Sequence, residues 1–115
     1  MSKQEIKIIT KIIREVTLYL MMHGFKDFIF ESKNTAKTTQ LIITLDDTKP
    51  DFIEAMQTKM NRERQMEIET YGWELIGDID QKNELEIISL LIDSMDVEYT
   101  QSKTIITLTR TNKYL

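Results

Sequence analysis

The chain has 115 residues, of which 41% are apolar and 30% charged, and its formal net charge is -4. This length suits one core, so we expect residues 1–115 to form a single domain. The negative charge and the scattered Lys and Arg residues argue against nucleic acid as a partner. The sequence has no cysteine, which excludes disulfides and thiol chemistry. It also has no apolar run of about twenty residues to cross a membrane, and its polar start is unlike a signal peptide. We therefore expect a cytoplasmic protein.

The first predicted element is a long helix. Ser2 and Glu5 have the spacing of a capping box, so the helix should begin at Lys3. Apolar residues recur at helical spacing and should face the core; they are Ile6, Ile9, Ile13, Val16 and Leu20, with Ile12, Tyr19 and His23 widening the stripe. Gly24 predicts the left-handed residue that ends the helix.

A hairpin of two strands should follow the helix. Residues 25–32 are rich in aromatic and β-branched side chains, residues 33–37 form a polar turn, and residues 38–45 form the second strand. In this second strand Thr39, Leu41, Ile43 and Leu45 alternate onto one face, as in a half-buried strand.

Thr48 and Pro50 predict the start of a second helix, whose apolar stripe is Phe52, Ile53, Met56 and Met60. Residues 61–69 are strongly polar, and residues 73–76 could be a short strand or a buried loop. Asp80 or Asn83 should cap a third helix, in which Leu85, Ile88, Leu91 or Ile92, and Met95 keep helical spacing. The chain should end with a strand from Val97, a turn at residues 101–103, a strand over residues 104–110 and a loose tail.

The expected order is helix, strand, strand, helix, helix, strand, strand. It predicts an α/β (α+β) two-layer sandwich with a mixed, mainly antiparallel sheet and helices on one face. We expect a core built from both hairpins, the first helix and the last helix; its members include Ile9, Ile13, Val16, Leu20, Leu41, Ile43, Ile88 and Leu91.

The helix end and the strand after it carry a resemblance. Proteins of the GHKL group, which includes histidine kinases and anti-sigma-factor kinases, have a helix reading Glu-Leu-x-x-Asn-Ala-x-x-His-Gly and a strand ending in Asp-x-Gly-x-Gly. Here Glu15, His23, Gly24 and Asp47 fall in register, and Tyr19 stands at the Asn position. In element order nearly the whole chain resembles this ATP-binding domain, with residues 48–83 in the interval of its mobile lid.

The resemblance implies a nucleotide site whose motifs are degenerate. By this likeness Asp47 would accept a hydrogen bond from the adenine amino group, and Glu15 would be the general base or the carboxylate beside the metal. Tyr19 replaces the Asn that holds Mg²⁺, an ion that prefers compact oxygen ligands. Lys49 and Asp51 replace glycines that let the backbone approach the nucleotide. Residues 82–86 replace the glycine-rich phosphate cradle with a glutamate-bearing helix start, which would repel a triphosphate.

Each of these residues also has a simpler structural interpretation. Glu15 could be an exposed helix glutamate paired with Lys11 or with nothing, His23 the polar end of the helix, and Tyr19 a core residue. Asp46 and Asp47 could be turn and cap residues. Asp78 with Asp80, and Glu67 with Glu69, fit helix caps and solvated charge better than a metal site. Met21, Met22, Met56 and Met60 could form an adaptable binding surface, although filling the core is the commoner use of methionine.

These observations predict a stand-alone, degenerate GHKL-like domain that is not an enzyme and needs no cofactor or metal ion. It would act as a bacterial regulatory module through a protein partner, with a homodimer as one form of that contact, and without nucleic acid or membrane. The alternative is an ATP- and Mg²⁺-dependent serine kinase of the anti-sigma-factor type, with Glu15 catalytic and Asp47 and Tyr19 at the cofactor. A third possibility is a domain of unrelated origin. Residues 61–83 would be the remnant of a lid with low local stability.

Overall fold

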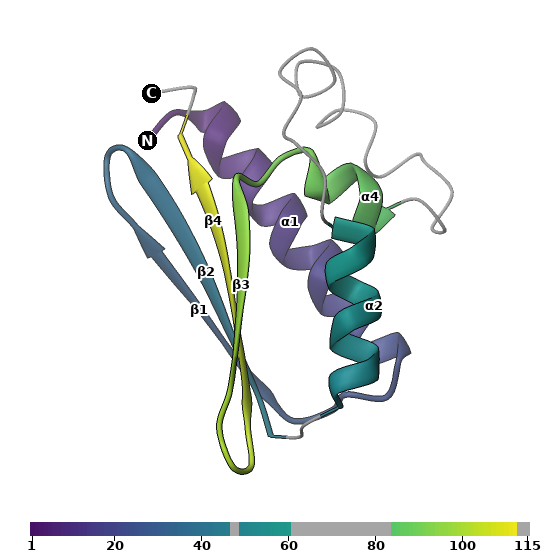
Figure 1. The fold of residues 1–115 in the computed structure, drawn as a ribbon. Coiled ribbons are helices and arrows are strands. Elements are labelled where there is room, and N and C mark those ends of the chain that lie inside the picture. Colours follow the sequence, from purple (N-terminus) through teal and green to yellow (C-terminus); the bar gives the residue numbers. More distant parts are fainter. Residues whose placement is uncertain (47–48, 61–83, 113–115) are drawn as a thin grey trace.

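The computed structural model of this chain describes residues 1–46, 49–60 and 84–112. Its elements are, in chain order, α1 (Lys3–Met22), β1 (Phe28–Asn34), β2 (Thr38–Leu45), α2 (Pro50–Met60), α4 (Glu84–Ser89), β3 (Ser94–Tyr99) and β4 (Thr104–Thr111). The strands form one sheet in the spatial order β1-β2-β4-β3, and the helices lie on one face of it (Figure 1). The predicted two-layer α+β architecture and its element order are confirmed.

The sheet is antiparallel throughout its described part. All three neighbouring strand pairs run antiparallel, so none of the described pairs is the parallel one that a mixed sheet requires. β2 and β4 lie at the centre, where Leu41 is opposite Leu108 and Ile43 is opposite Ile106. In both strands every second residue is buried, and the residues between them are half-buried or exposed, as the pleat predicts; β1 and β3 are the edge strands.

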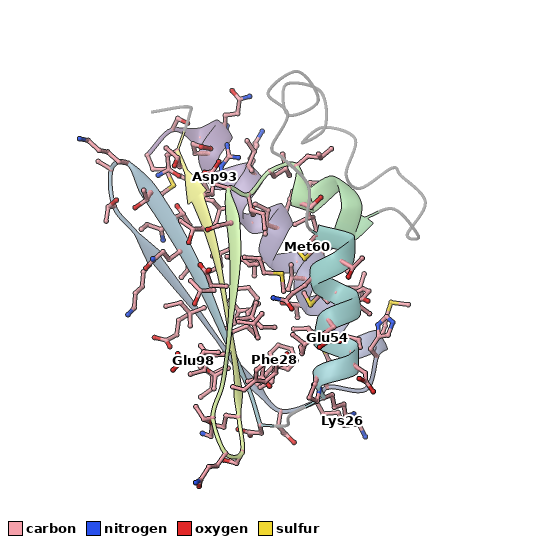
Figure 2. All side chains as sticks on the ribbon, viewed as in Figure 1. Lys26, Phe28, Glu54, Met60, Asp93 and Glu98 are labelled. Atoms are coloured by element: carbon pink, nitrogen blue, oxygen red, sulfur yellow. The ribbon has the colours of Figure 1, made fainter. Side chains whose placement is uncertain are left out.

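The core lies between the sheet and the helices, where side chains fill the space between the two layers (Figure 2). The predicted core residues are buried except Ile13, which is half-buried. Ile6 was wrongly predicted to face the core, because 49% of it is exposed. Glu5, Ile8, Ile12 and Glu15 are buried on α1 instead. Ile6 and Ile13 are seven residues, or about two helical turns, apart and therefore lie on the same side of α1. The buried face of the helix is rotated away from that side.

A buried ion pair lies at the first turn of α1. The Arg110 Nη2 atom donates to both carboxylate oxygens of Glu5 at 2.8 Å, and Nε donates to them at 3.1 and 3.2 Å. Arg110 Nη1 also donates to the Leu91 carbonyl oxygen at 2.7 Å. The predicted cap is present, since Ser2 Oγ accepts from the Glu5 backbone N–H at 3.1 Å. The Glu5 carboxylate, however, joins the beginning of α1 to the end of β4.

The observed helix ends can be compared with the start and stop residues that the sequence predicted. α1 ends as expected, because Gly24 has φ +93° and Phe25 N–H donates to the Leu20 carbonyl at 3.1 Å. The third predicted helix is shorter than expected: α4 ends at Ser89, and Met95 belongs to β3. After this helix the Leu91 carbonyl accepts a hydrogen bond from the Arg110 side chain on β4, and the chain joins the sheet from Ser94, three residues before the predicted start.

Several predictions concern other parts of the chain. The first strand runs from Phe28 to Asn34 rather than over residues 25–32, and Thr111 belongs to β4 rather than to the tail. The polar stretch at residues 61–69, the expected lid remnant and the pairs Asp78–Asp80 and Glu67–Glu69 lie outside the described residues. None of the helices that the structure describes is long and apolar enough to cross a membrane.

Candidate functional site

Two of the predicted site residues, Glu15 and Tyr19, lie one turn apart on α1. Glu15 was expected to be exposed, and that prediction is wrong, because only 2% of the residue is accessible. Its Oε1 atom accepts a hydrogen bond from Arg14 Nη1 at 3.1 Å, whereas its Oε2 atom is buried without a hydrogen-bond partner. A buried carboxylate oxygen that lacks a partner is unfavourable and rare in folded proteins, so Glu15 stands out chemically.

Tyr19 belongs to a group of rings that we call the aromatic cluster: Tyr19, His23, Phe25 and Phe52. The Tyr19 ring centroid is 4.2 Å from that of His23 and 5.7 Å from that of Phe52, with which it stacks. Phe52 also lies 4.9 Å from Phe25, so the cluster connects the last turn of α1 with the first turn of α2. Such offset and tilted contacts stabilise beyond the burial of area alone. Tyr19 thus packs against the core, as the simpler interpretation predicted.

Charged and polar groups border the aromatic cluster. Lys49 Nζ lies 5.0 Å from the Phe25 ring centroid, a cation–π contact. His23 is exposed, and its Nδ1 atom lies 2.8 Å from the Tyr19 carbonyl oxygen. The ring thus lies beside a carbonyl group of the last helical turn, as expected of a histidine at the polar end of a helix. Met21 and Met22 are exposed beside it, whereas Met56 and Met60 are in the core.

The remaining predicted site residues have no described position. Asp47, the expected adenine contact, lies outside the described residues, as do the side chains of Glu84 and Glu86 at the start of α4. The structure therefore brings together Glu15 and Tyr19 on one helix but gives no geometry between them and Asp47. Among the described residues, no group of three or more His, Asp or Glu side chains is placed to hold a metal ion.

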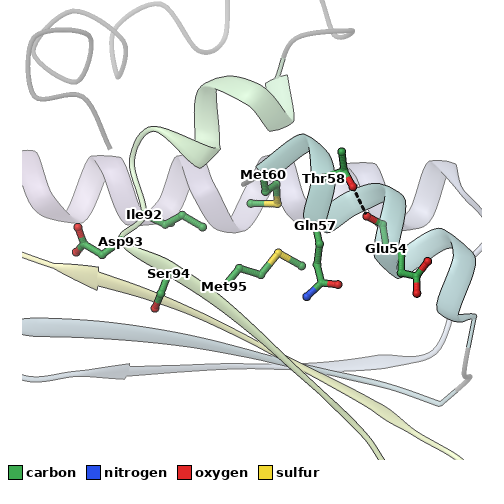
Figure 3. Close-up of a pocket in the computed structure, with 8 residues that line it drawn as sticks. All are labelled: Glu54, Gln57, Thr58, Met60, Ile92, Asp93, Ser94 and Met95. Atoms are coloured by element: carbon green, nitrogen blue, oxygen red, sulfur yellow. Dashed lines mark hydrogen bonds between the residues drawn. The ribbon is translucent and has the colours of Figure 1, made fainter. Parts of the chain in front are cut away.

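The sequence interpretation missed a groove between α2 and the beginning of β3, with a volume of about 530 Å³ (Figure 3). Its lining residues are Glu54, Gln57, Thr58, Met60, Ile92, Asp93, Ser94 and Met95. Met60, Ile92 and Met95 are the apolar members, and the side chains of Met95 and Gln57 extend toward each other across the groove. One signal of this groove was present in the sequence, since Gln57 and Thr58 interrupt the apolar stripe of α2 next to Met60.

A negatively charged side chain lies at each end of the groove. Glu54 lies at the end on α2 and Asp93 at the end where the chain enters β3. The Asp93 carboxylate accepts a hydrogen bond from the Thr111 backbone N–H, which fixes it against the end of β4. Thr58 Oγ1 donates to the Glu54 carbonyl oxygen at 2.9 Å, so this part of the wall is a regular helix surface. The lining is mainly polar, and Met95 is its half-buried apolar member, since Met60 and Ile92 are almost fully buried. Such a lining, with a carboxylate at each end, suits a positively charged group.

Searches of protein-family models, of curated proteins and of solved structures found no match to this chain. The resemblance to the GHKL group therefore rests on the sequence motifs and on the element order.

Proposed function

We propose that this protein is a stand-alone, degenerate relative of the GHKL ATP-binding domain that acts by binding another protein and neither binds ATP nor transfers phosphate. The observation that carries the proposal is the position of Tyr19 in the aromatic cluster. Its ring is engaged between α1 and α2 by contacts with His23 and Phe52. A phenol held in this way is a poor replacement for the compact oxygen ligand that Mg²⁺ needs.

The groove between α2 and β3 supports a protein-binding role. Its lining is mainly polar, with carboxylates at both ends and the half-buried side chain of Met95 between them, and polar or charged side chains of a partner protein are suited to such a lining. Among the described residues that line it are neither Glu15 nor Tyr19, which the resemblance would assign to a nucleotide site. The proposed setting is the bacterial cytoplasm, where the partner would be a regulatory protein or a second copy of the chain.

One observation favours the alternative, an ATP-binding serine kinase of the anti-sigma-factor type. The buried Oε2 atom of Glu15 has no hydrogen-bond partner, and such an atom calls for an explanation. Under the alternative Glu15 would be the general base. Against it stand the chemistry of Tyr19 and the Lys49 and Asp51 side chains at the positions of the family's glycines.

Titration calorimetry with ATP and Mg²⁺, together with a thermal-shift assay, tests the proposal directly. A ligand at about a hundred times its dissociation constant stabilises a protein by about 2.7 kcal/mol, so binding would be visible as a higher melting temperature. We expect no shift at millimolar ATP, either in the natural protein or in Tyr19→Asn. Tyr19→Phe is the matched control, because it keeps the stacked ring and removes only the hydroxyl.

Micromolar ATP affinity in the natural protein would overturn the proposal and make Glu15→Gln the next variant to assay for phosphate transfer. Recovery of binding in Tyr19→Asn alone would show that the glycine positions matter less than we infer.

A further inference from the structure

The inference begins with β3, which is an edge strand. The sheet order places β4 on one side of β3, and no described strand lies on its other side. The Thr100 backbone N–H donates to the Lys103 carbonyl at 2.9 Å, and the two strands pair from Tyr99 with Thr104 onward. Hydrogen-bonded and non-hydrogen-bonded pairs alternate along an antiparallel ladder. The N–H and C=O groups of Asp96 and Glu98 therefore face β4, and those of Met95, Val97 and Tyr99 face outward.

The same three residues point their side chains to the helix face of the sheet. Met95 and Val97 are half-buried against the core, and Met95 also lines the groove beside α2. In an antiparallel pair, residues directly opposite each other share a face. A strand added outside β3 would pair with Met95, Val97 and Tyr99. Its residues opposite them would lie on the helix face of the sheet, and the one opposite Met95 would lie beside the groove. The free backbone edge and the groove thus form one continuous surface, which we call the β3 edge site.

The other face of β3 is acidic. Asp96 and Glu98 are exposed and point away from the helices, as Figure 2 shows for Glu98. Glu54 and Asp93 are the charged residues that line the groove. A second copy of β3 is a poor occupant, because like charges directly opposite each other are destabilising. Every register that pairs two or three of Met95, Val97 and Tyr99 with their own copies places Asp96 or Glu98 opposite an acidic residue.

We propose that the β3 edge site binds an extended segment of a partner protein as an added antiparallel strand. In that segment apolar side chains that pack beside Met95 and Val97 alternate with Lys or Arg side chains that pair with Asp96 and Glu98. Backbone hydrogen bonds to Met95, Val97 and Tyr99 supply affinity, and the alternation of side chains supplies specificity. The net charge of -4 attracts such a basic segment at long range. This inference rests on the proposed protein-binding function and names the class of partner.

The test uses the full chain and two fluorescent peptides of about eight residues. One alternates Lys with Leu and Val, and the other has Glu in place of every Lys. Fluorescence anisotropy should show binding of the Lys peptide with a dissociation constant below about 1 mM, and at least about tenfold weaker binding of the Glu peptide. Failure of the Lys peptide to bind at this concentration, or equal binding of both peptides, would overturn the inference.

Two pairs of variants locate the binding. Asp96→Lys combined with Glu98→Lys should weaken the Lys peptide at least about tenfold, whereas Glu31→Lys should change it less than about twofold. Glu31 is the matched control because it is an exposed acid on β1, at the opposite edge of the sheet. Tyr99→Pro removes an outward N–H that β4 does not use, and Tyr99→Ala removes only the side chain. We expect Pro to weaken binding several-fold more than Ala, with both variants folded by circular dichroism.

Equal binding by Tyr99→Pro and Tyr99→Ala would exclude strand addition, and so would an unchanged affinity in the Asp96 and Glu98 double variant. Sedimentation velocity shows whether the protein forms a dimer. If it does, and if Tyr99→Pro dissociates that dimer, the β3 edge site binds a second copy of the chain and the inference is overturned. The ATP titration separates this failure from that of the proposed function. A protein that binds neither ATP nor the Lys peptide contradicts only the β3 edge site, whereas ATP binding contradicts the proposed function whatever the peptide does.

Discussion

Replacing Arg110 with methionine should lower the free energy of unfolding by at least about 4 kcal/mol. Arg110 is 2% exposed and Glu5 is 0% exposed, so the substitution removes the guanidinium group that binds a carboxylate in the core. Removing one member of a buried pair costs about 3–5 kcal/mol. The Leu91 carbonyl also loses its 2.7 Å bond from Arg110, which adds about 1 kcal/mol. Glu5→Leu should cost about 1 kcal/mol less than Arg110→Met, because it leaves this bond in place.

Urea denaturation followed by circular dichroism measures these differences. The double variant Glu5→Leu with Arg110→Met removes both charges, so it should recover at least about 3 kcal/mol relative to Arg110→Met. It should fold even where Arg110→Met does not. The matched control is Lys103→Met, which breaks the exposed contact between Lys103 Nζ and Asp46 Oδ1 at 3.8 Å and should cost less than about 1 kcal/mol. A loss below about 1 kcal/mol in Arg110→Met, or single losses that simply add in the double variant, would refute the reasoning.

Three further measurements test other parts of the fold. Ile12→Ala should cost about 2–5 kcal/mol in urea denaturation and Ile6→Ala less than about 1 kcal/mol, since Ile12 is fully buried and Ile6 is half exposed; similar losses would mean that the buried face of α1 is misassigned. Glu15→Met should raise the free energy of unfolding by about 1 kcal/mol, because it removes a buried oxygen that has no partner, and a clear destabilisation would reveal an interaction that Glu15 makes in solution. Gly24→Ala should cost about 1 kcal/mol because Gly24 has φ +93°, and Gly24→Asn should cost less; equal stability of all three would contradict the left-handed helix end.

Much of the fold could be predicted from short-range patterns in the sequence. The Ser2 cap, the Gly24 stop and the Pro50 start are local signals, and the helices begin or end at these residues. The alternation from Thr39 to Leu45 identified the buried face of a central strand, because period two depends only on the pleat. The third helix was overestimated because Leu85, Ile88 and Met95 fit a helical period although Met95 belongs to a strand. A short apolar run fits both a helix and a strand, and periodicity alone does not choose between them.

The candidate site was predicted less well than the fold. Tyr19 packs against the core as its simpler interpretation said, but Glu15 was expected in solvent and is buried. Neither the groove nor the outward edge of β3 was foreseen, since both depend on which strand lies at the edge of the sheet and on how far α2 stands from it. Strand order is set by contacts between residues distant in the chain, which leave no regular period in the sequence.

The sequence by itself determined the class of fold, the element order, both ends of α1, the start of α2 and the acidic character of the chain, because propensity, capping and charge act over a few residues. Only the tertiary structure decided that Glu5 pairs with Arg110 across 105 positions, that Ile8 rather than Ile6 faces the core, and that β3 is an edge strand. A charged residue in a helix's first turn has the same sequence signature whether it faces water or the core. The difference arises from desolvation, which depends on what the folded chain places beside it.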